Sequence, residues 1–186
     1  VIRRLRRSPA AARVRVVVPE GWNRFDIARR LRERRVCDDG AFLAATTDPA
    51  LLAELGLQRS AEGWLFPATY ELPADGEAAD VVRRLVGEAK ARVDRLVATH
   101  GAGFEGLRRT LRFGASDVIA LASIVEKEAA VDDERPIIAS VFLNRLRDPT
   151  VTEVKLQADP TAIYGCLVNA PPTPPCTAWL TSGGKP

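Results

Sequence analysis

Leu121-Ala-Ser-Ile-Val-Glu-Lys-Glu-Ala-Ala-Val131 is the stretch that most strongly predicts the fold and the function of this chain. At about 100° per residue of an α-helix, its apolar residues predict one buried stripe. That stripe consists of Val118, Leu121, Ala122, Val125 and Ala129. Glu126 lies at its edge among small residues, which leave room for a bound molecule, whereas Glu128 points to the other side of the helix.

Partial burial favours the protonated form of a carboxyl group, and this is the form that a general acid needs. Glu126 is therefore a candidate catalytic residue. The alternative that periodicity leaves open is an exposed glutamate on an ordinary helix, with Lys127 solvated beside it.

Further blocks of sequence stand in a fixed order around this helix. They are Val16-Val-Val-Pro-Glu-Gly-Trp22, Glu62-Gly-Trp-Leu-Phe-Pro-Ala-Thr-Tyr70, Ala139-Ser-Val-Phe-Leu-Asn-Arg-Leu146 and Lys155-Leu-Gln-Ala-Asp-Pro-Thr-Ala-Ile-Tyr-Gly165. Their order and spacing resemble the MltG (YceG-like) family of membrane-anchored endolytic murein transglycosylases, from about Val14 to Gly165. The resemblance implies that Glu126, the first glutamate of Ile-Val-Glu-Lys-Glu, is the catalytic acid.

Several polar and aromatic residues are expected to bind the sugars. The resemblance implies this role for Ser123, Asn144, Gln157, Asp159 and Tyr164. Pyranose rings stack on aromatic faces, so Trp64 and Tyr70 are candidate platforms, although core packing is the preferred interpretation of Trp64. Asp159 is equally explained as the N-cap of a helix that has Pro160 at its first position and ends at Gly165. Gln157 and Asp159 project to the same side if their segment is extended. The family usually has aspartate where Ala68 stands, so no role is carried over for that carboxylate.

The resemblance implies a reaction that needs only one carboxylate. Hydrolysis of a glycoside normally uses two. The resembled enzymes instead use the tethered C6 hydroxyl of the same N-acetylmuramic acid, whose high effective molarity removes the need to activate water. Neither a metal nor an organic cofactor is implied. A non-catalytic peptidoglycan-binding module and a water-using muramidase are the alternatives.

The pattern of elements predicts an α+β chain in three parts. Residues 14–75 are expected to form a small αβ subdomain, 76–165 a mainly helical core and 166–186 a Pro/Gly-rich irregular tail. The resemblance implies that the first part is LysM-like and that the second is a partial catalytic core; a purely structural appendage is the alternative for the first part. In the first part we expect a strand at 13–18, helices that begin at Asn23, at Asp38 or Asp39 and at Asp48, and an extended segment at 64–72. In the second part we expect helices at 77–100 and 104–111, a helix capped by Ser116 and a helix that begins at Asp132 or Asp133. Ile137, Ile138, Val141, Phe142 and Leu146 are expected to be buried on one side of this last helix.

Composition and chain ends bear on partners and location. The net charge of +3 comes from basic residues interleaved with acidic ones, which favours solvated faces over nucleic-acid binding. Met is absent, so we expect that an N-terminal piece precedes Val1. The resemblance implies that this piece is a membrane anchor and that the catalytic domain lies on the periplasmic side of the bacterial inner membrane. Peptidoglycan strands are the expected partner, and peptidoglycan synthases are candidates.

The C-terminal part of the chain gives two further expectations. Family members continue after Gly165 with blocks that line the groove, so the catalytic domain is expected to be shortened and a poor catalyst. Cys166 and Cys176 bracket a Pro-rich segment, and the sequence leaves open whether they form a disulfide or remain free thiols.

Overall fold

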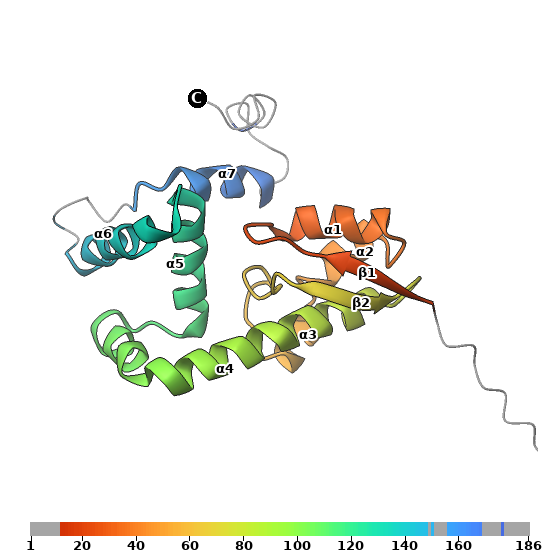
Figure 1. Cartoon of the computed structure of the whole chain (residues 1–186), viewed down its shortest axis with the longest axis horizontal. Helices are drawn as coiled ribbons and strands as arrows, with labels where there is room; N and C mark the ends of the chain where they lie inside the picture. The colour runs from red at the N-terminus through yellow and green to blue at the C-terminus, as the bar shows by residue number, and fades with distance from the viewer. Residues whose placement is uncertain (1–11, 149, 151–155, 169–175, 177–186) are drawn as a thin grey trace, which may run out of the picture. The chain divides into compact units, whose positions relative to one another are not determined.

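A computed structural model describes residues 12–148, 150, 156–168 and 176. These residues belong to two compact units, which divide between Gly101 and Ala102 (Figure 1). Helices dominate, and the described part of the chain has one two-stranded sheet. The predicted α+β class is therefore confirmed.

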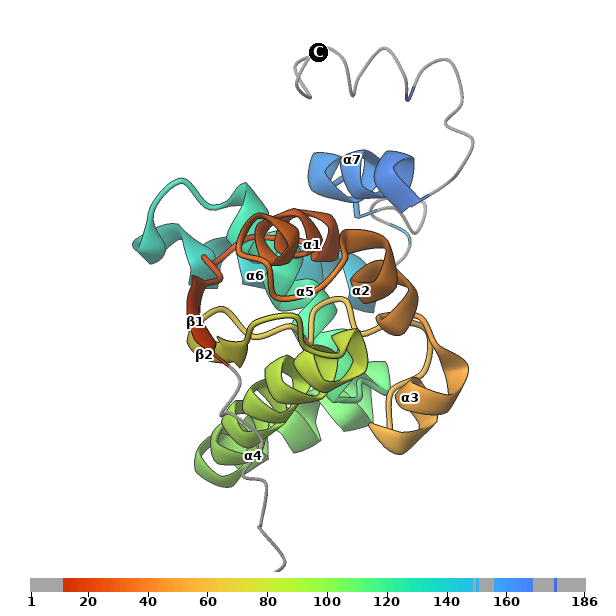
Figure 2. The same cartoon turned by 90° about the vertical axis from the view of Figure 1, so that its right-hand side faces the viewer.

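The sheet of the first unit pairs strands from distant parts of the sequence. β1 (Arg13–Val17) and β2 (Thr69–Pro73) are antiparallel, with Val16 opposite Tyr70. Side chains alternate between the two faces of a strand, and Val16, Tyr70 and Leu72 are buried. Both views show the sheet between α1 and the first half of α4 (Figures 1 and 2).

Three short helices lie between the strands, and side-chain caps define where they begin. α1 (Arg24–Glu33), α2 (Asp39–Ala45) and α3 (Pro49–Glu54) follow Asn23, Asp38 and Asp48. Each cap accepts a hydrogen bond from a backbone N–H of the first turn, at 2.7 Å for Asp48 and Leu51. The three predicted helix starts are confirmed.

The long helix α4 (Ala78–Leu111) crosses the division between the units. Its first half buries Val81, Val82, Leu85, Val86 and Ala89. Arg83 also binds Glu54 of α3 at 2.8 Å, within the same unit. This half of α4 therefore completes the first core, and the two compact units divide after Gly101. The domain boundary near Gly76 stays a prediction.

A kink in α4 separates the two helices that the sequence predicts. His100 has non-helical backbone angles (φ −122°, ψ 30°), and Gly101 and Gly103 follow it. Glycine favours the helical conformation by about 1 kcal/mol less than alanine, which explains why the helix is irregular here.

The second unit contains α5 (Ala115–Glu128), a 3-10 turn η1 (Asp132–Glu134), α6 (Arg135–Arg147) and α7 (Asp159–Val168). Both α6 and α7 pack on α5. The centre of this unit is a small core of Val125, Phe142 and Ala158, against which Leu121, Ile124, Ile138, Ala139 and Leu156 pack. The Pro136 near the start of α6 is tolerated because the first helical turn has no N–H partners inside the helix.

The structure corrects two predicted helix ends in this unit. α5 is capped at Gly114, whose N–H donates to the Asp117 carboxylate at 2.8 Å, and Ser116 lies inside the first turn. α7 continues through Gly165 to Val168. Glycine can occupy a helix interior as well as its end, so the residue type alone did not mark the stop.

The buried faces of α5 and α6 also differ from the prediction. Ala122 is exposed, and Ile124 packs on the core in its place. Ile137 is 65% exposed and Val141 42% exposed, so two of the five residues expected to be buried on α6 are open to solvent. No helix in the described part of the chain is long and apolar enough to cross a membrane.

Candidate active site

A pocket of about 520 Å³ in the second unit combines apolar and charged side chains. Glu128 of α5, Glu134 of η1 and Gln157 contribute polar groups. The remaining lining residues come from α6, and they are Ile137, Ile138, Val141, Phe142 and Arg145. Half of the lining residues are polar or charged, so the pocket offers hydrogen-bonding groups as well as apolar surface. The exposure of Ile137 and Val141 follows from their position in this lining.

Glu126, the predicted acid, does not line this pocket. Its side chain is 34% exposed, in agreement with the expected partial burial. Its Oε2 accepts a hydrogen bond from Arg135 Nε at 3.0 Å. Arg135 Nη1 also lies 2.8 Å from Asp132 Oδ1. The hydrogen bond to Glu126 raises the pKa of the Arg135 guanidinium, and the charge of Asp132 acts in the same direction.

Glu128 is the carboxylate of α5 that reaches the pocket. Two residues correspond to about 200° around a helix, so Glu126 and Glu128 face different sides. Within the described residues, Glu128 takes part in no salt bridge. The two glutamates of one motif thus have different surroundings, because one is paired with a cation and the other faces a pocket.

Gln157 and Asn144 lie at or next to the pocket, as expected of residues that bind sugar. Gln157 lines it, but its φ is +54°, so the segment is not extended there and the expected alignment with Asp159 is wrong. Asn144 lines an adjoining pocket of about 450 Å³, which shares Val141 and Arg145 with the first. Gln157 therefore shares a pocket with Glu128, and Asn144 lines the pocket next to it.

The other predicted residues lie elsewhere. Ser123 is exposed, and its hydroxyl donates to the Ala120 carbonyl oxygen at 2.7 Å. Asp159 is the exposed first residue of α7, and Tyr164 is half-buried further along that helix. None of these three lines either pocket.

Tyr70 is the clearest correction, because it belongs to the core of the first unit. Its side chain is only 3% exposed, and its hydroxyl donates to the Phe66 carbonyl oxygen at 2.6 Å. Burial raises the pKa of Tyr70 to about 12. The ring has no open face on which a sugar could stack. Trp64 is buried as well, which agrees with the preferred interpretation of this residue as part of the core.

Two arginines of α6 contribute to this region, and the sequence analysis assigned neither of them a role. Arg145 Nη1 donates to the Leu156 carbonyl oxygen, and its guanidinium lies 5.8 Å from the centre of the Phe142 ring. Arg135 binds Glu126. Arg145 occurs in a block that carries the family resemblance, but basic residues between acidic ones were interpreted as a solvated face.

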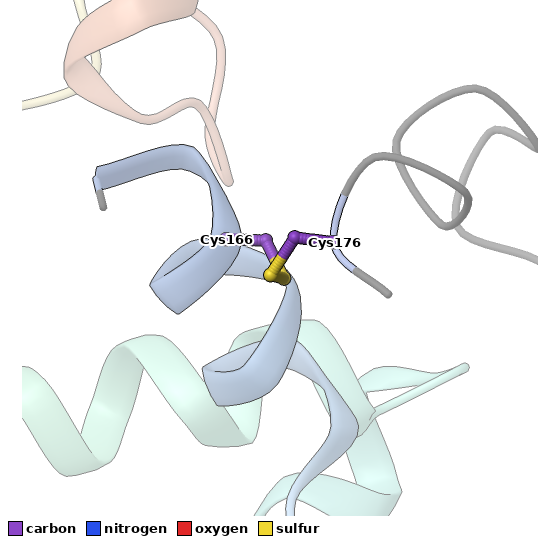
Figure 3. The surroundings of a disulfide bond; sticks show 2 residues. All are labelled: Cys166 and Cys176. Atoms are coloured by element: carbon purple, nitrogen blue, oxygen red, sulfur yellow. A yellow bond between two sulfur atoms is a disulfide. The ribbon is translucent and has the colours of Figure 1, made fainter. Parts of the chain in front are cut away.

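Cys166 and Cys176 form a disulfide (Figure 3). The sequence had left open whether these two cysteines pair or remain free thiols. Their Cα atoms are 5.2 Å apart. Cys166 lies on α7, so the bond attaches this helix to the chain beyond it. Cys37, in the first unit, is a free thiol.

Comparisons with known proteins agree on one family. The family model described as the YceG-like family matches residues 1–173. The endolytic murein transglycosylase of Streptococcus pneumoniae serotype 2 (strain D39) is 27% identical over 170 residues, which cover 80% of this chain and 29% of that protein. The endolytic murein transglycosylase of Bacillus subtilis (strain 168) is 30% identical over 104 residues, which cover 55% of this chain and 26% of that protein.

The chain therefore spans less than a third of the length of these curated relatives. A crystal structure of a yceG-like protein from Listeria monocytogenes superposes with a TM-score of 0.64 at 24% identity. The match covers 86% of this chain and 54% of the Listeria chain, and it shows a common fold.

Proposed function

The chain belongs to the YceG-like family, and from this premise we propose that it is the part of an endolytic murein transglycosylase that holds the catalytic carboxylate. The observation that carries the proposal is the pocket in which Glu128 and Gln157, two residues of the motif blocks, share one lining. Curated relatives named endolytic murein transglycosylase support it.

The proposed reaction cuts the bond between C1 of N-acetylmuramic acid and O4 of N-acetylglucosamine inside a nascent glycan strand. A carboxylic acid gives its proton to O4, and the C1–O4 bond breaks. The C6 hydroxyl oxygen of the same muramic acid bonds to C1, and its proton passes to the carboxylate. The products are a 1,6-anhydro end and a free 4-hydroxyl, and no water is consumed. Such a cut would end the elongation of the strand.

Two glutamates compete for the role of the acid. The sequence predicts Glu126, and that assignment stays a prediction. Glu128 is a second candidate, because a general acid must touch the substrate. Glu128 lines the pocket, whereas Glu126 does not line it and binds Arg135 at 3.0 Å. The predicted sugar contacts of Asn144, Gln157, Ser123, Asp159 and Tyr164 stay proposals, and the position of Gln157 in the pocket lining supports its part in them.

The cellular setting follows from the same proposal. We infer an extracytoplasmic location, because disulfides such as Cys166–Cys176 persist in oxidising compartments. A membrane anchor is proposed from the family resemblance. Peptidoglycan synthases are proposed partners, since nascent strands are their product. The first unit is proposed to add LysM-like glycan binding.

The test is the digestion of purified glycan strands with the parent chain, Glu126→Gln and Glu128→Gln, followed by mass spectrometry of the new ends. We expect anhydro ends from the parent chain and a loss of about 10²–10⁴-fold in rate for Glu126→Gln, the usual contribution of a general acid, and a much smaller loss for Glu128→Gln. Parent-like turnover by Glu126→Gln together with an inactive Glu128→Gln would move the role to Glu128. Reducing ends would indicate a muramidase, and strands bound but uncut would indicate a binding module.

A further inference from the structure

Two adjoining pockets of the second unit differ in the charges of their linings. The larger pocket, of about 520 Å³, is lined by Glu128, Glu134 and one arginine, Arg145. The smaller pocket, of about 450 Å³, is lined by Arg145, Arg147 and one acidic residue, Asp148. Carboxylates outnumber arginines in the larger pocket, and arginines outnumber carboxylates in the smaller one. An anionic group of a bound molecule is therefore favoured in the smaller pocket.

The Asp148 carboxylate already has hydrogen-bond donors outside the pocket lining. Its Oδ1 accepts a hydrogen bond from the Thr150 N–H at 3.0 Å, and the Thr150 hydroxyl donates to the same oxygen. No salt bridge joins Arg145 or Arg147 to a carboxylate in the described part of the chain. The positive charge of the smaller pocket is therefore available to a ligand.

Arg145 is held where the two pockets meet. Its Nη1 donates to the Leu156 carbonyl oxygen, and its guanidinium lies 5.8 Å from the centre of the Phe142 ring. The side chain is half-buried and lines both pockets. An arginine has five N–H donors, so the bond to Leu156 leaves donors for a carboxylate. A planar guanidinium also loses less freedom than an ammonium for each hydrogen bond that it forms. Asn144 adds an amide group to the lining of the smaller pocket.

We propose that the smaller pocket is a subsite for a carboxylate carried by the substrate, which Arg145 binds together with Arg147. This inference rests on the proposed function, because the muramic acid of a murein strand supplies the carboxylate. Each muramic acid has a lactyl group at O3. The carboxyl of this group is free in strands without peptides, and elsewhere it is joined to a peptide that has carboxylates of its own. N-acetylglucosamine has no such group, so the subsite distinguishes the two alternating sugars and fixes the register of the strand.

The two arginines should contribute unequally to binding. Arg145 is half-buried and held by its neighbours, so Arg145→Gln should weaken the binding of a carboxylate ligand by about 10- to 100-fold. Arg147 is exposed, so solvent and salt screen its charge, and Arg147→Gln should weaken binding by no more than about fivefold. Arg145→Lys keeps the charge without the planar fork and should fall between the parent chain and Arg145→Gln. Because the carboxylate is not at the bond that breaks, Arg145→Gln should raise the KM of strand cleavage and change kcat little.

The experiment measures binding to disaccharides of N-acetylglucosamine linked to N-acetylmuramic acid, which lack the bond that the proposed reaction cuts. NMR titrations compare a peptide-bearing disaccharide, one without a peptide, and one whose lactyl carboxyl is converted to an amide. We expect the parent chain to bind a carboxylate-bearing disaccharide about tenfold or more tightly than the amide, and Arg145→Gln to remove this preference. Arg109→Gln, which changes an exposed arginine on α4, is the matched control and should keep it. Preference for the disaccharide without a peptide would assign the lactyl carboxylate, and preference for the peptide-bearing one would assign a carboxylate of the peptide.

Equal affinity of the parent chain for all three disaccharides would overturn the proposal. A folded Arg145→Gln variant that keeps the parent preference would do the same. If circular dichroism shows that Arg145→Gln does not fold, Arg145→Lys and Arg147→Gln replace it, and parent affinity in both would refute the subsite. The titration does not depend on turnover. A parent chain that releases no anhydro ends would therefore refute the proposed function and leave carboxylate binding measurable.

Discussion

Removal of the Cys166–Cys176 disulfide should destabilise the second unit by an amount that follows from the length of the closed loop. A disulfide restricts the unfolded chain, with an entropy of about −2.1 − 1.5R ln n cal/mol/K for a loop of n residues. The two cysteines are 10 positions apart. This spacing gives about 9 cal/mol/K, or about 2.7 kcal/mol near room temperature.

The measurement is thermal and urea unfolding of Cys166→Ser with Cys176→Ser beside the parent chain. For a unit of this size, about 2.7 kcal/mol corresponds to a fall of roughly 10–20 °C in Tm. Cys37→Ser is the control, because this thiol forms no disulfide. Burial, and then the charge of Asp38, raises the pKa of Cys37 to about 11, so the thiol stays protonated at neutral pH.

Two outcomes would refute this reasoning. Equal Tm values for the double variant and the parent chain would show that the closed loop does not limit the unfolded state as the entropy argument requires. Three reactive thiols per unfolded parent chain, instead of one, would show that the bond does not form.

Two further predictions test the cores. Phe142→Ala should lower the free energy of unfolding by about 3–5 kcal/mol, because Phe142 is 4% exposed at the centre of the second unit. Ile137 is 65% exposed, so Ile137→Ala should change this free energy by no more than about 0.5 kcal/mol. Equal losses for the two variants in urea unfolding would contradict the assigned burial. Tyr70 has a folded-state pKa of about 12 against an ordinary 10.0, so its contribution to stability is complete below pH 10 and is lost as the pH rises towards 12. Near-ultraviolet absorbance should show one tyrosine that ionises above its ordinary pH in the folded chain but not in denaturant. Loss of this late step in Tyr70→Phe would identify the tyrosine as Tyr70.

Helix starts in the first unit were predictable because a cap is a local interaction. Asn23, Asp38 and Asp48 each bind a backbone N–H two or three residues ahead, and no distant residue is needed. The same rule failed at Ser116 because a competing local interaction was available. Asp117 bonds back to the Gly114 N–H, and the helix begins two residues before Ser116 would cap it.

The candidate site was predictable in its location and less so in its geometry. Spacing along α5 correctly separates the faces of Glu126 and Glu128. It contains no information on what each face meets, since that depends on where α6 returns. Arg135 reaches Glu126 and the lining of α6 reaches Glu128, and both contacts join separate elements.

The sequence by itself determined the family, the α+β class and the caps of the first unit, and it predicted the short segment that holds the candidate catalytic carboxylates. Only the tertiary structure decided that Tyr70 is buried, because β2 pairs with β1 across most of the first unit. It also decided that half of α4 belongs to that unit. The physical reason is that capping and periodicity act over a few residues, whereas burial and ion pairing depend on surfaces that distant segments supply on folding.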